Sequence, residues 1–246
     1  MLSGILDFLR IRKSFEKMQM NAVAGLIFLW LSGNANLFAF AVFLAYETAL
    51  ITYGYLLNSF EDEKQDRKAG KDFGLGGNKA AAAPFLIILP AFAVALSIAF
   101  REAFLFGALG FFLATAYSLR PVRLKERGIY GVVSSSLAQS SMPFLFLSAL
   151  AGHSVLSAYF AAWLFLRQMA IETEHHISDF ENDKKTGVKS IAVLIGKERA
   201  GGIMLMSIYL FIALSLAPIL LGMQGIALSL SLLFFSAPAL SHILRI

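Results

Sequence analysis

The sequence predicts an all-α membrane protein, a polytopic bundle of about eight transmembrane helices that forms one domain over residues 1–246. Hydrophobic residues make up 58% of the chain and charged residues only 15%, against about 25% charged in soluble domains. Apolar stretches recur at about the 20-residue length that a helix needs to cross a bilayer. A charged motif also occurs twice, which divides the chain into two parallel halves, approximately residues 19–130 and 131–246.

Hydropathy places each predicted span between polar connections, and residues 1–17 combine Leu and Phe with basic residues in an amphipathic lead-in at the membrane surface. Five prolines fall within the spans, which membrane helices tolerate when neighbours satisfy the freed carbonyls. The predicted spans are approximately 19–33, 37–57, 83–100, 103–119, 131–151, 154–177, 201–222 and 225–244.

The basic residues lie almost entirely on one side of these spans. Of the 21 Lys and Arg, all but Arg101 and Arg167 fall at the termini or in the connections after the second, fourth and sixth spans. The positive-inside rule therefore predicts an integral protein of the cytoplasmic membrane with both termini and both motifs in the cytoplasm. This placement explains the net charge of +5 without nucleic acid, and the absence of cysteine excludes disulfides and thiolate metal sites.

The repeated motif is acidic and follows a long apolar run in each copy. The first copy contains Asn58, Asp62 and Asp66, and the second contains Asp179 and Asp183; a basic pair and a glycine follow each. Carboxylates at positions i and i+4 share one helix face and repel each other. Two such pairs at the same membrane side call for a counter-charge, and Mg²⁺ favours carboxylates together with substrate phosphates. The motif predicts metal ions that bridge to a diphosphate.

Further polar residues line the predicted spans that lead to these motifs. Glu47 shares the stripe of Asn58 and Asp62, and Gln168 and Glu172 share the stripe of Asp179. Ionisable groups at this depth normally face the bundle interior. We expect Arg167 to pair with a carboxylate on a neighbouring helix, and His175 and His176 to be hydrogen-bonded helix residues near the site rather than metal ligands.

With these motifs the sequence resembles the UbiA superfamily of intramembrane prenyltransferases over nearly its whole length. Ser59 stands where the family usually has Asp, and eight spans are predicted where the family usually has nine. The resemblance rests on the first motif at Asn58, Asp62 and Asp66, the second at Asp179 and Asp183, its tail Gly187–Gly196, and the stretch Tyr117–Lys125 after the fourth span.

The resemblance implies transfer of an isoprenyl group from an allylic diphosphate to a small acceptor, with an aromatic quinone precursor as the expected acceptor. Two Mg²⁺ ions would be held by the five motif residues, and Tyr117 would act on the leaving group or the allylic cation. The implied diphosphate ligands are Arg67, Arg123, Lys125 and Lys184. Two alternatives stay open: a terpene cyclase of the same superfamily, and a non-enzymatic membrane carrier or lipid-binding protein. The sequence leaves the oligomeric state and the catalytic base undetermined.

Overall fold

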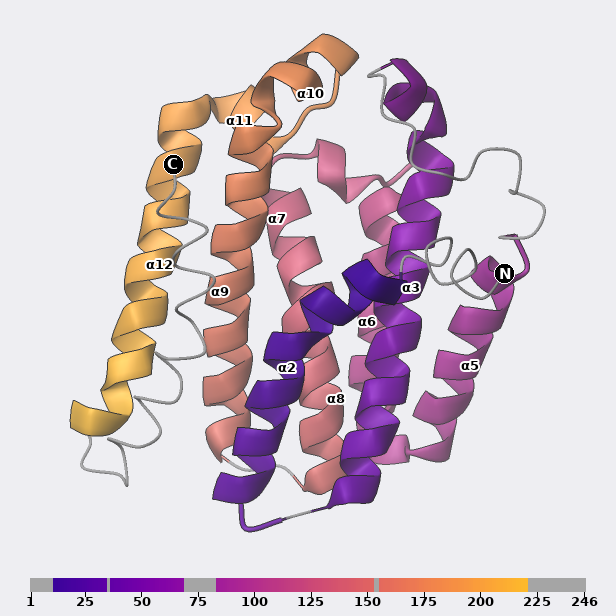
Figure 1. Ribbon diagram of the computed structural model, residues 1–246, viewed down its shortest axis with the longest axis vertical. Helices are drawn as coiled ribbons and strands as arrows, with labels where there is room; N and C mark the ends of the chain where they lie inside the picture. The colour runs from indigo at the N-terminus through magenta and orange to yellow at the C-terminus, as the bar shows by residue number, and fades with distance from the viewer. Residues whose placement is uncertain (1–10, 35, 69–82, 153–154, 221–246) are drawn as a thin grey trace.

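The computed structural model describes residues 11–34, 36–68, 83–152 and 155–220, with side chains over 18–34, 36–63, 83–152 and 155–217. Within these ranges every regular element is helical, and most helices run roughly side by side along the long axis of the bundle (Figure 1). The predicted all-α class is confirmed. The predicted span at 225–244 and residues 1–10 of the predicted lead-in lie outside the described residues.

The helices coincide closely with the predicted spans. The predicted span 131–151 is one continuous helical path whose middle turn widens into a π-helix, and the connection after span 154–177 contains two short helices. The elements are α2 Ile11–Leu31, α3 Leu37–Lys68, α5 Phe85–Ala99, η1 Arg101–Ala103, α6 Phe104–Ser118, η2 Leu124–Glu126, α7 Ile129–Ser136, η3 Leu137–Ser141, α8 Met142–Ala151, α9 Val155–Ser178, α10 Phe180–Thr186, α11 Ile191–Ile195 and α12 Lys197–Leu220.

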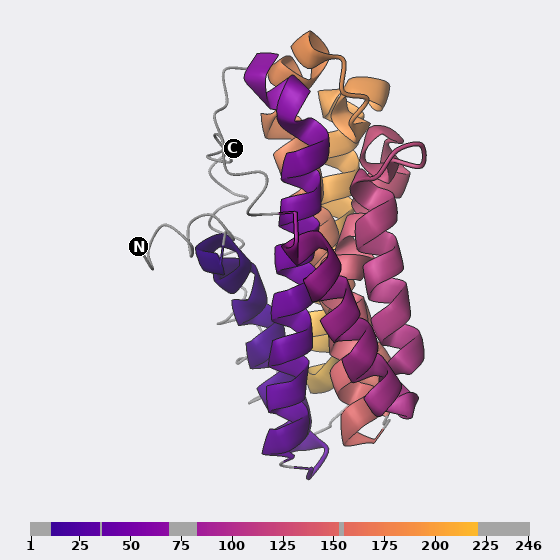
Figure 2. The same cartoon turned by 90° about the vertical axis from the view of Figure 1, so that its right-hand side faces the viewer.

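Within the described part of the chain, two helical stretches are long and apolar enough to cross a membrane, Leu37–Glu63 and Lys197–Ala217. A third crossing arises if α5 and α6, which meet at an angle of 117°, are taken together as one broken span. Each of these two helices has only 15 residues, fewer than the ~20 that a straight crossing needs. Within the described residues, helices are therefore found where spans are predicted, and α5 and α6 form a bent pair of short helices (Figure 2).

Aromatic side chains fill the core between the helices. Phe144 of α8 packs edge-on against Phe28 of α2 and stacks on Phe160 of α9, with centroid separations of 5.2 and 5.6 Å. Tyr46 of α3 stacks on Phe146 at 4.1 Å. Burial of such rings contributes most of the packing energy of a helical bundle, so α3, α8 and α9 are held in fixed relation to one another.

The polar ends of α3, α6 and α9 lie together at one end of the bundle. The last turns of α3, the connection after α6 and the short helix α10 after α9 all lie at the top in Figure 1. The opposite end carries the connections from α2 to α3 and from α5 to α6. This arrangement brings the segments that carry the repeated motif to the same end.

Candidate active site

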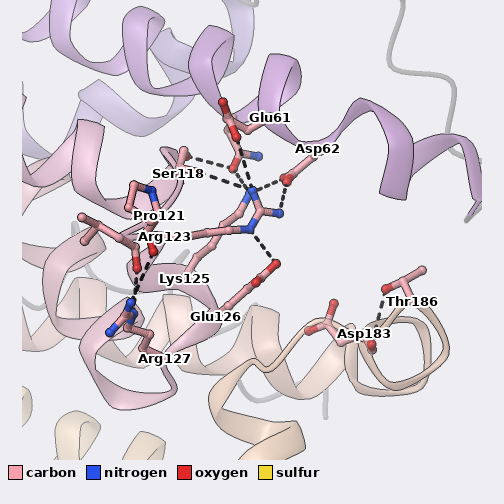
Figure 3. Close-up of polar contacts among 12 residues, drawn as sticks. Glu61, Asp62, Ser118, Pro121, Arg123, Lys125, Glu126, Arg127, Asp183 and Thr186 are labelled. Carbon is pink, nitrogen blue, oxygen red and sulfur yellow. Dashed lines mark hydrogen bonds and ion pairs between the residues drawn. The ribbon is translucent and has the colours of Figure 1, made fainter.

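The first motif faces the connection that follows α6. Asn58 and Asp62 lie one turn apart on α3, and the Asn58 Oδ1 accepts hydrogen bonds from Ser118 Oγ at 3.1 Å and from Lys125 Nζ at 2.6 Å. Asp62 binds two cations, with Oδ1 2.7 Å from the Arg123 guanidinium and Oδ2 in contact with Lys125 Nζ. The Lys125 ammonium therefore sits between two oxygens of the predicted metal-binding motif (Figure 3).

The connection holds its two cations rigidly. Arg123 adopts a left-handed backbone conformation with φ 40° and ψ 62°, which is uncommon for a residue with a Cβ. Its Nε donates to Glu126 Oε1 at 2.6 Å and its Nη1 lies 3.4 Å from the Ser118 carbonyl oxygen. Arg127 closes the loop by donating to the Val122 carbonyl oxygen at 2.7 Å. Only 4% of Arg123 is exposed, so its head group is fixed toward α3.

Close backbone packing also anchors Lys125. A Cβ placed on Gly131 of α7 would lie 2.9 Å from both the Leu124 carbonyl oxygen and the Lys125 Cα. A glycine at this position lets α7 approach the connection more closely than any other residue would. The position of Lys125 therefore depends on α7 as well as on Asp62.

The two buried cations differ in how firmly they keep their charge. Burial lowers the pKa of Lys125, and the adjacent Asp62 carboxylate offsets this effect only in part. Burial also disfavours the charged form of Arg123, but hydrogen bonds and charges from Glu126 and Asp62 outweigh it and raise the pKa of Arg123. Arg123 thus stays charged at any physiological pH, and Lys125 is the cation of this pair that can release a proton.

The second motif occupies the start of α10. Asp179 is the residue before Phe180–Thr186, and its carbonyl oxygen accepts from the Asp183 N–H at 2.8 Å. Gly187 ends the helix with φ 81°, a conformation that favours glycine. Lys184, a predicted diphosphate ligand, is exposed, and its Nζ lies 6.0 Å from the Phe180 ring centroid. In Figure 3, Asp183 of α10 and Asp62 of α3 lie apart, and no drawn contact joins them.

Tyr117, in the last turn of α6, connects the two motifs electrostatically. Its hydroxyl interacts with the charges of Asp62 from α3, Asp183 from α10 and Glu172 from α9. The predicted catalytic tyrosine therefore lies within the electrostatic reach of both acidic segments.

The described side chains do not form a finished metal site. Among them, no three Asp, Glu or His side chains converge closely enough to hold a metal ion. The side chains of Asp66 and Arg67 lie outside the described residues. The donors nevertheless suit a hard cation, because Asn58 and Asp62 supply oxygen atoms that already surround the Lys125 ammonium. The assignment of Asp179 and Asp183 as metal ligands stays a prediction.

Several functional contacts were missed in the sequence. Glu126 orients Arg123 from three residues away, and Ser118 donates a hydrogen bond to Asn58. The only signal for the Glu126–Arg123 contact in the sequence is that the two opposite charges lie three residues apart. The expected partner of Arg167 is not found, since its Nε has no hydrogen-bond partner and no described carboxylate forms an ion pair with it. His176 Nδ1 likewise has no hydrogen-bond partner within the described residues.

Comparison with known families gives one match over most of the chain. The model of the UbiA prenyltransferase family matches residues 20–246. Among curated proteins, the digeranylgeranylglyceryl phosphate synthase of Pyrococcus horikoshii is 31% identical over 121 residues, which cover 49% of this chain and 42% of that protein. The lycopene elongase/hydratase of Halobacterium salinarum is 28% identical over 158 residues, covering 61% and 55%. The matches therefore span about half the length of these relatives.

Solved structures share the fold. A UbiA homologue from Archaeoglobus fulgidus bound to GPP and Mg²⁺ superposes with a TM-score of 0.79 at 21% identity, over 99% of this chain and 87% of that one. A structure of a digeranylgeranylglyceryl phosphate synthase gives a TM-score of 0.70 at 19% identity, over 98% and 91%. These likenesses support the helical architecture described above.

Proposed function

This chain belongs to the UbiA prenyltransferase family, and we propose that it is a Mg²⁺-dependent membrane enzyme that transfers an isoprenyl group from an allylic diphosphate to a second substrate. The observation that carries the proposal is the contact of Asn58 and Asp62 with two buried cations at the end of the bundle that also holds Asp179 and Asp183. Acidic and basic groups at one site suit a metal–diphosphate complex, because carboxylates bind the metal cation and basic groups bind the diphosphate anion.

The metal ligands in this proposal come from both halves of the chain. Asn58, Asp62 and Asp66 would bind from α3, and Asp179 and Asp183 from the start of α10, with two Mg²⁺ ions as the expected number. When bound, the ions would neutralise the negative charge that grows on the diphosphate as the C–O bond breaks. The A. fulgidus homologue bound to GPP and Mg²⁺ supports Mg²⁺ as the cofactor and an isoprenyl diphosphate as the substrate.

The basic residues would change partners when substrate binds. Without ligand, Arg123 and Lys125 neutralise Asp62. A divalent cation at this carboxylate would compete with both side chains, which frees them to donate to phosphate oxygens. Arg67 and Lys184 are the further diphosphate ligands that the sequence predicts. Because Arg123 and Lys125 are buried and pre-oriented, they would lose little entropy on binding.

Tyr117 would stabilise the reacting end of the substrate. Its electrostatic interactions with both Asp62 and Asp183 support a hydroxyl near the proposed diphosphate site, where it would donate to the leaving oxygen or face the allylic cation. The apolar bundle below would hold the isoprenyl chain and exclude water from the cation.

The membrane placement in this proposal follows the distribution of Lys and Arg, with the active end at the cytoplasmic face. We treat residues 1–246 as one domain whose halves, approximately 19–130 and 131–246, each contribute one acidic motif. The sequence predicts an aromatic acceptor, whereas the two curated relatives are named for a glyceryl phosphate and for lycopene. A test must therefore include all three acceptor classes.

The experiment uses the full chain in membranes, supplied with geranyl diphosphate and, separately, a hydroxybenzoate, a prenylated glyceryl phosphate and lycopene. We expect a prenylated product with Mg²⁺ and none with EDTA. Asp62→Asn and Asp179→Asn should each lower turnover by about 10²-fold or more, the loss typical of removing one electrostatic contact to a transition state. Glu198→Gln, an exposed carboxylate at the start of α12, is the matched control and should retain full turnover.

Two outcomes would overturn the assignment. Undiminished turnover by both aspartate variants would remove the metal site from the proposal. A cyclised hydrocarbon made from the diphosphate without any acceptor would instead identify the terpene cyclase that the sequence leaves open.

A further inference from the structure

A second polar cluster lies deeper in the bundle than the acidic motifs. Glu172 of α9, 6% exposed, lies about two helical turns before Asp179. Its Oε1 accepts hydrogen bonds from Gln168 Nε2 at 2.7 Å and from Gln139 Nε2 at 3.2 Å. Two amide groups from different helices thus hold one carboxylate in the interior of the bundle.

The π-helical turn η3 positions one of these amides. Gln139 lies in the middle of Leu137–Ser141, and its backbone carbonyl accepts from Asn21 Nδ2 of α2 at 2.7 Å. Its side chain also bonds to Ser135 Oγ at 2.5 Å. Single π-helical turns in α-helices often occur at functional sites. Here the turn directs a pinned amide toward Glu172.

The carboxylate lies on the side of α9 that faces the proposed reaction site. Glu172 interacts electrostatically with Tyr117 of α6 and with His176, one turn further along α9. Tyr117 in turn interacts with Asp62 and Asp183. Glu172 is therefore placed below the acidic motifs, at the depth where the allylic carbon would follow its diphosphate into the bundle.

A purely structural role accounts poorly for this residue. A carboxylate inside a membrane-spanning helix carries an insertion cost that reaches roughly 2.5–3.5 kcal/mol at the helix centre, and an amide or apolar residue would fill the space at a lower cost. The proposed transfer, in contrast, requires a group that removes a proton from the acceptor, and the metal and diphosphate ligands do not supply one.

We infer that Glu172, oriented by Gln139 and Gln168, is the general base that takes the proton from the acceptor during prenyl transfer. The inference rests on the proposed function. As the allylic C–O bond breaks, its electron pair leaves on the diphosphate; an electron pair of the acceptor forms the new bond to the allylic carbon. The proton lost from the attacked acceptor atom moves to a Glu172 carboxylate oxygen, so the products are prenylated acceptor, diphosphate and one proton on the enzyme.

The test separates diphosphate ionisation from prenyl transfer in Glu172→Gln. The full chain in membranes receives geranyl diphosphate and Mg²⁺, with or without the acceptor that wild type prenylates in the panel above. General acid–base groups typically contribute about 10²–10⁴-fold, so prenylated product should fall by at least about 10²-fold. Diphosphate release without acceptor, which needs only the metal site, should stay within about threefold of wild type. Glu172→Asp should restore part of the transfer.

Glu174→Gln provides the matched control for loss of a buried carboxylate. Glu174 is 7% exposed on the same helix, and its Oε2 lies 3.8 Å from His175 Nε2; this variant should keep the wild-type ratio of transfer to release. Thermal stabilisation of Glu172→Gln by geranyl diphosphate with Mg²⁺ should match that of wild type, which verifies that the variant is folded.

Three results would overturn the inference. These are transfer by Glu172→Gln within threefold of wild type, a parallel loss of release and transfer in this variant, or selective loss of transfer in His176→Gln instead. If wild type itself makes no prenylated product from any acceptor, the proposed function fails as a whole; if wild type transfers and Glu172→Gln transfers equally, only this inference fails.

Discussion

One methyl group added at Gly131 should disturb the candidate site from outside it. In Gly131→Ala, the new Cβ would meet the Leu124 carbonyl oxygen and the Lys125 Cα, both at 2.9 Å. Both atoms belong to the backbone, so neither can rotate away as a side-chain tip would. The connection must move away from α7, and Lys125 must move with it relative to Asn58 and Asp62.

The size of the effect follows from two opposing contributions. Overpacking typically costs about 1–3 kcal/mol, while replacing glycine by alanine inside a helix gains up to about 1 kcal/mol. The backbone clash places the cost in the upper part of its range, for a net loss of about 1–2 kcal/mol. For a chain of this size, each kcal/mol shifts Tm by about 2–4 °C, so Tm should fall by roughly 2–8 °C.

The assay measures thermal unfolding of purified protein in detergent and the KM for geranyl diphosphate in membranes. Gly201→Ala on α12 is the control, because no atom that the structure describes, outside the neighbouring helix backbone, lies within 4 Å of its added Cβ. Its Tm should equal or exceed that of wild type. Gly131→Ala should also raise KM severalfold through displacement of Lys125. If the two alanine variants match in both Tm and KM, the close approach of α7 does not position this lysine.

Three further predictions address individual contacts. Because burial lowers the pKa of Lys125, this side chain loses its charge at a lower pH than an ordinary lysine. As the pH is raised, KM for the diphosphate should therefore increase before an ordinary lysine would lose its proton. Lys125→Arg should move this increase in KM to higher pH. Glu126→Gln removes the charge that orients Arg123 at 2.6 Å and should raise KM severalfold with kcat little changed, as measured by steady-state kinetics. Trp163→Phe loses the 2.8 Å hydrogen bond to Ser215 Oγ that joins α9 to α12. The free energy of unfolding should fall by about 1 kcal/mol, as measured by denaturant unfolding. KM for the diphosphate should stay unchanged, because this contact lies away from the candidate site.

Most of the fold could be predicted because hydropathy alone decides where a chain enters and leaves a membrane. Three of the predicted spans correspond directly to helices: span 37–57 to α3, span 131–151 to α7–η3–α8 and span 154–177 to α9. The π-helical turn at Leu137–Ser141 could not be predicted, because it depends on contacts that Gln139 makes with α2 and α9.

The candidate site was predictable in its residues but not in its pairing. The spacing of Asn58 and Asp62 gave their shared helix face, and the predicted diphosphate ligands Arg123 and Lys125 do lie beside them. Their direct contact with Asp62 could not be inferred, since it requires the course of the connection after α6. That course depends on a left-handed Arg123 and on its bond to Glu126, which no periodic pattern signals.

The connection between α6 and α7 has a consequence for how such a chain can change over time. Surface links between helices usually tolerate insertions at little cost, but this link supplies two of the charged groups at the candidate site and is clamped from α3 on one side and α7 on the other. Even one inserted residue between Ser118 and Gly128 would carry Arg123 or Lys125 out of reach of Asp62. Variation in the length of this protein should therefore collect elsewhere, and a chain cut at this link should not regain function when its two pieces are co-expressed.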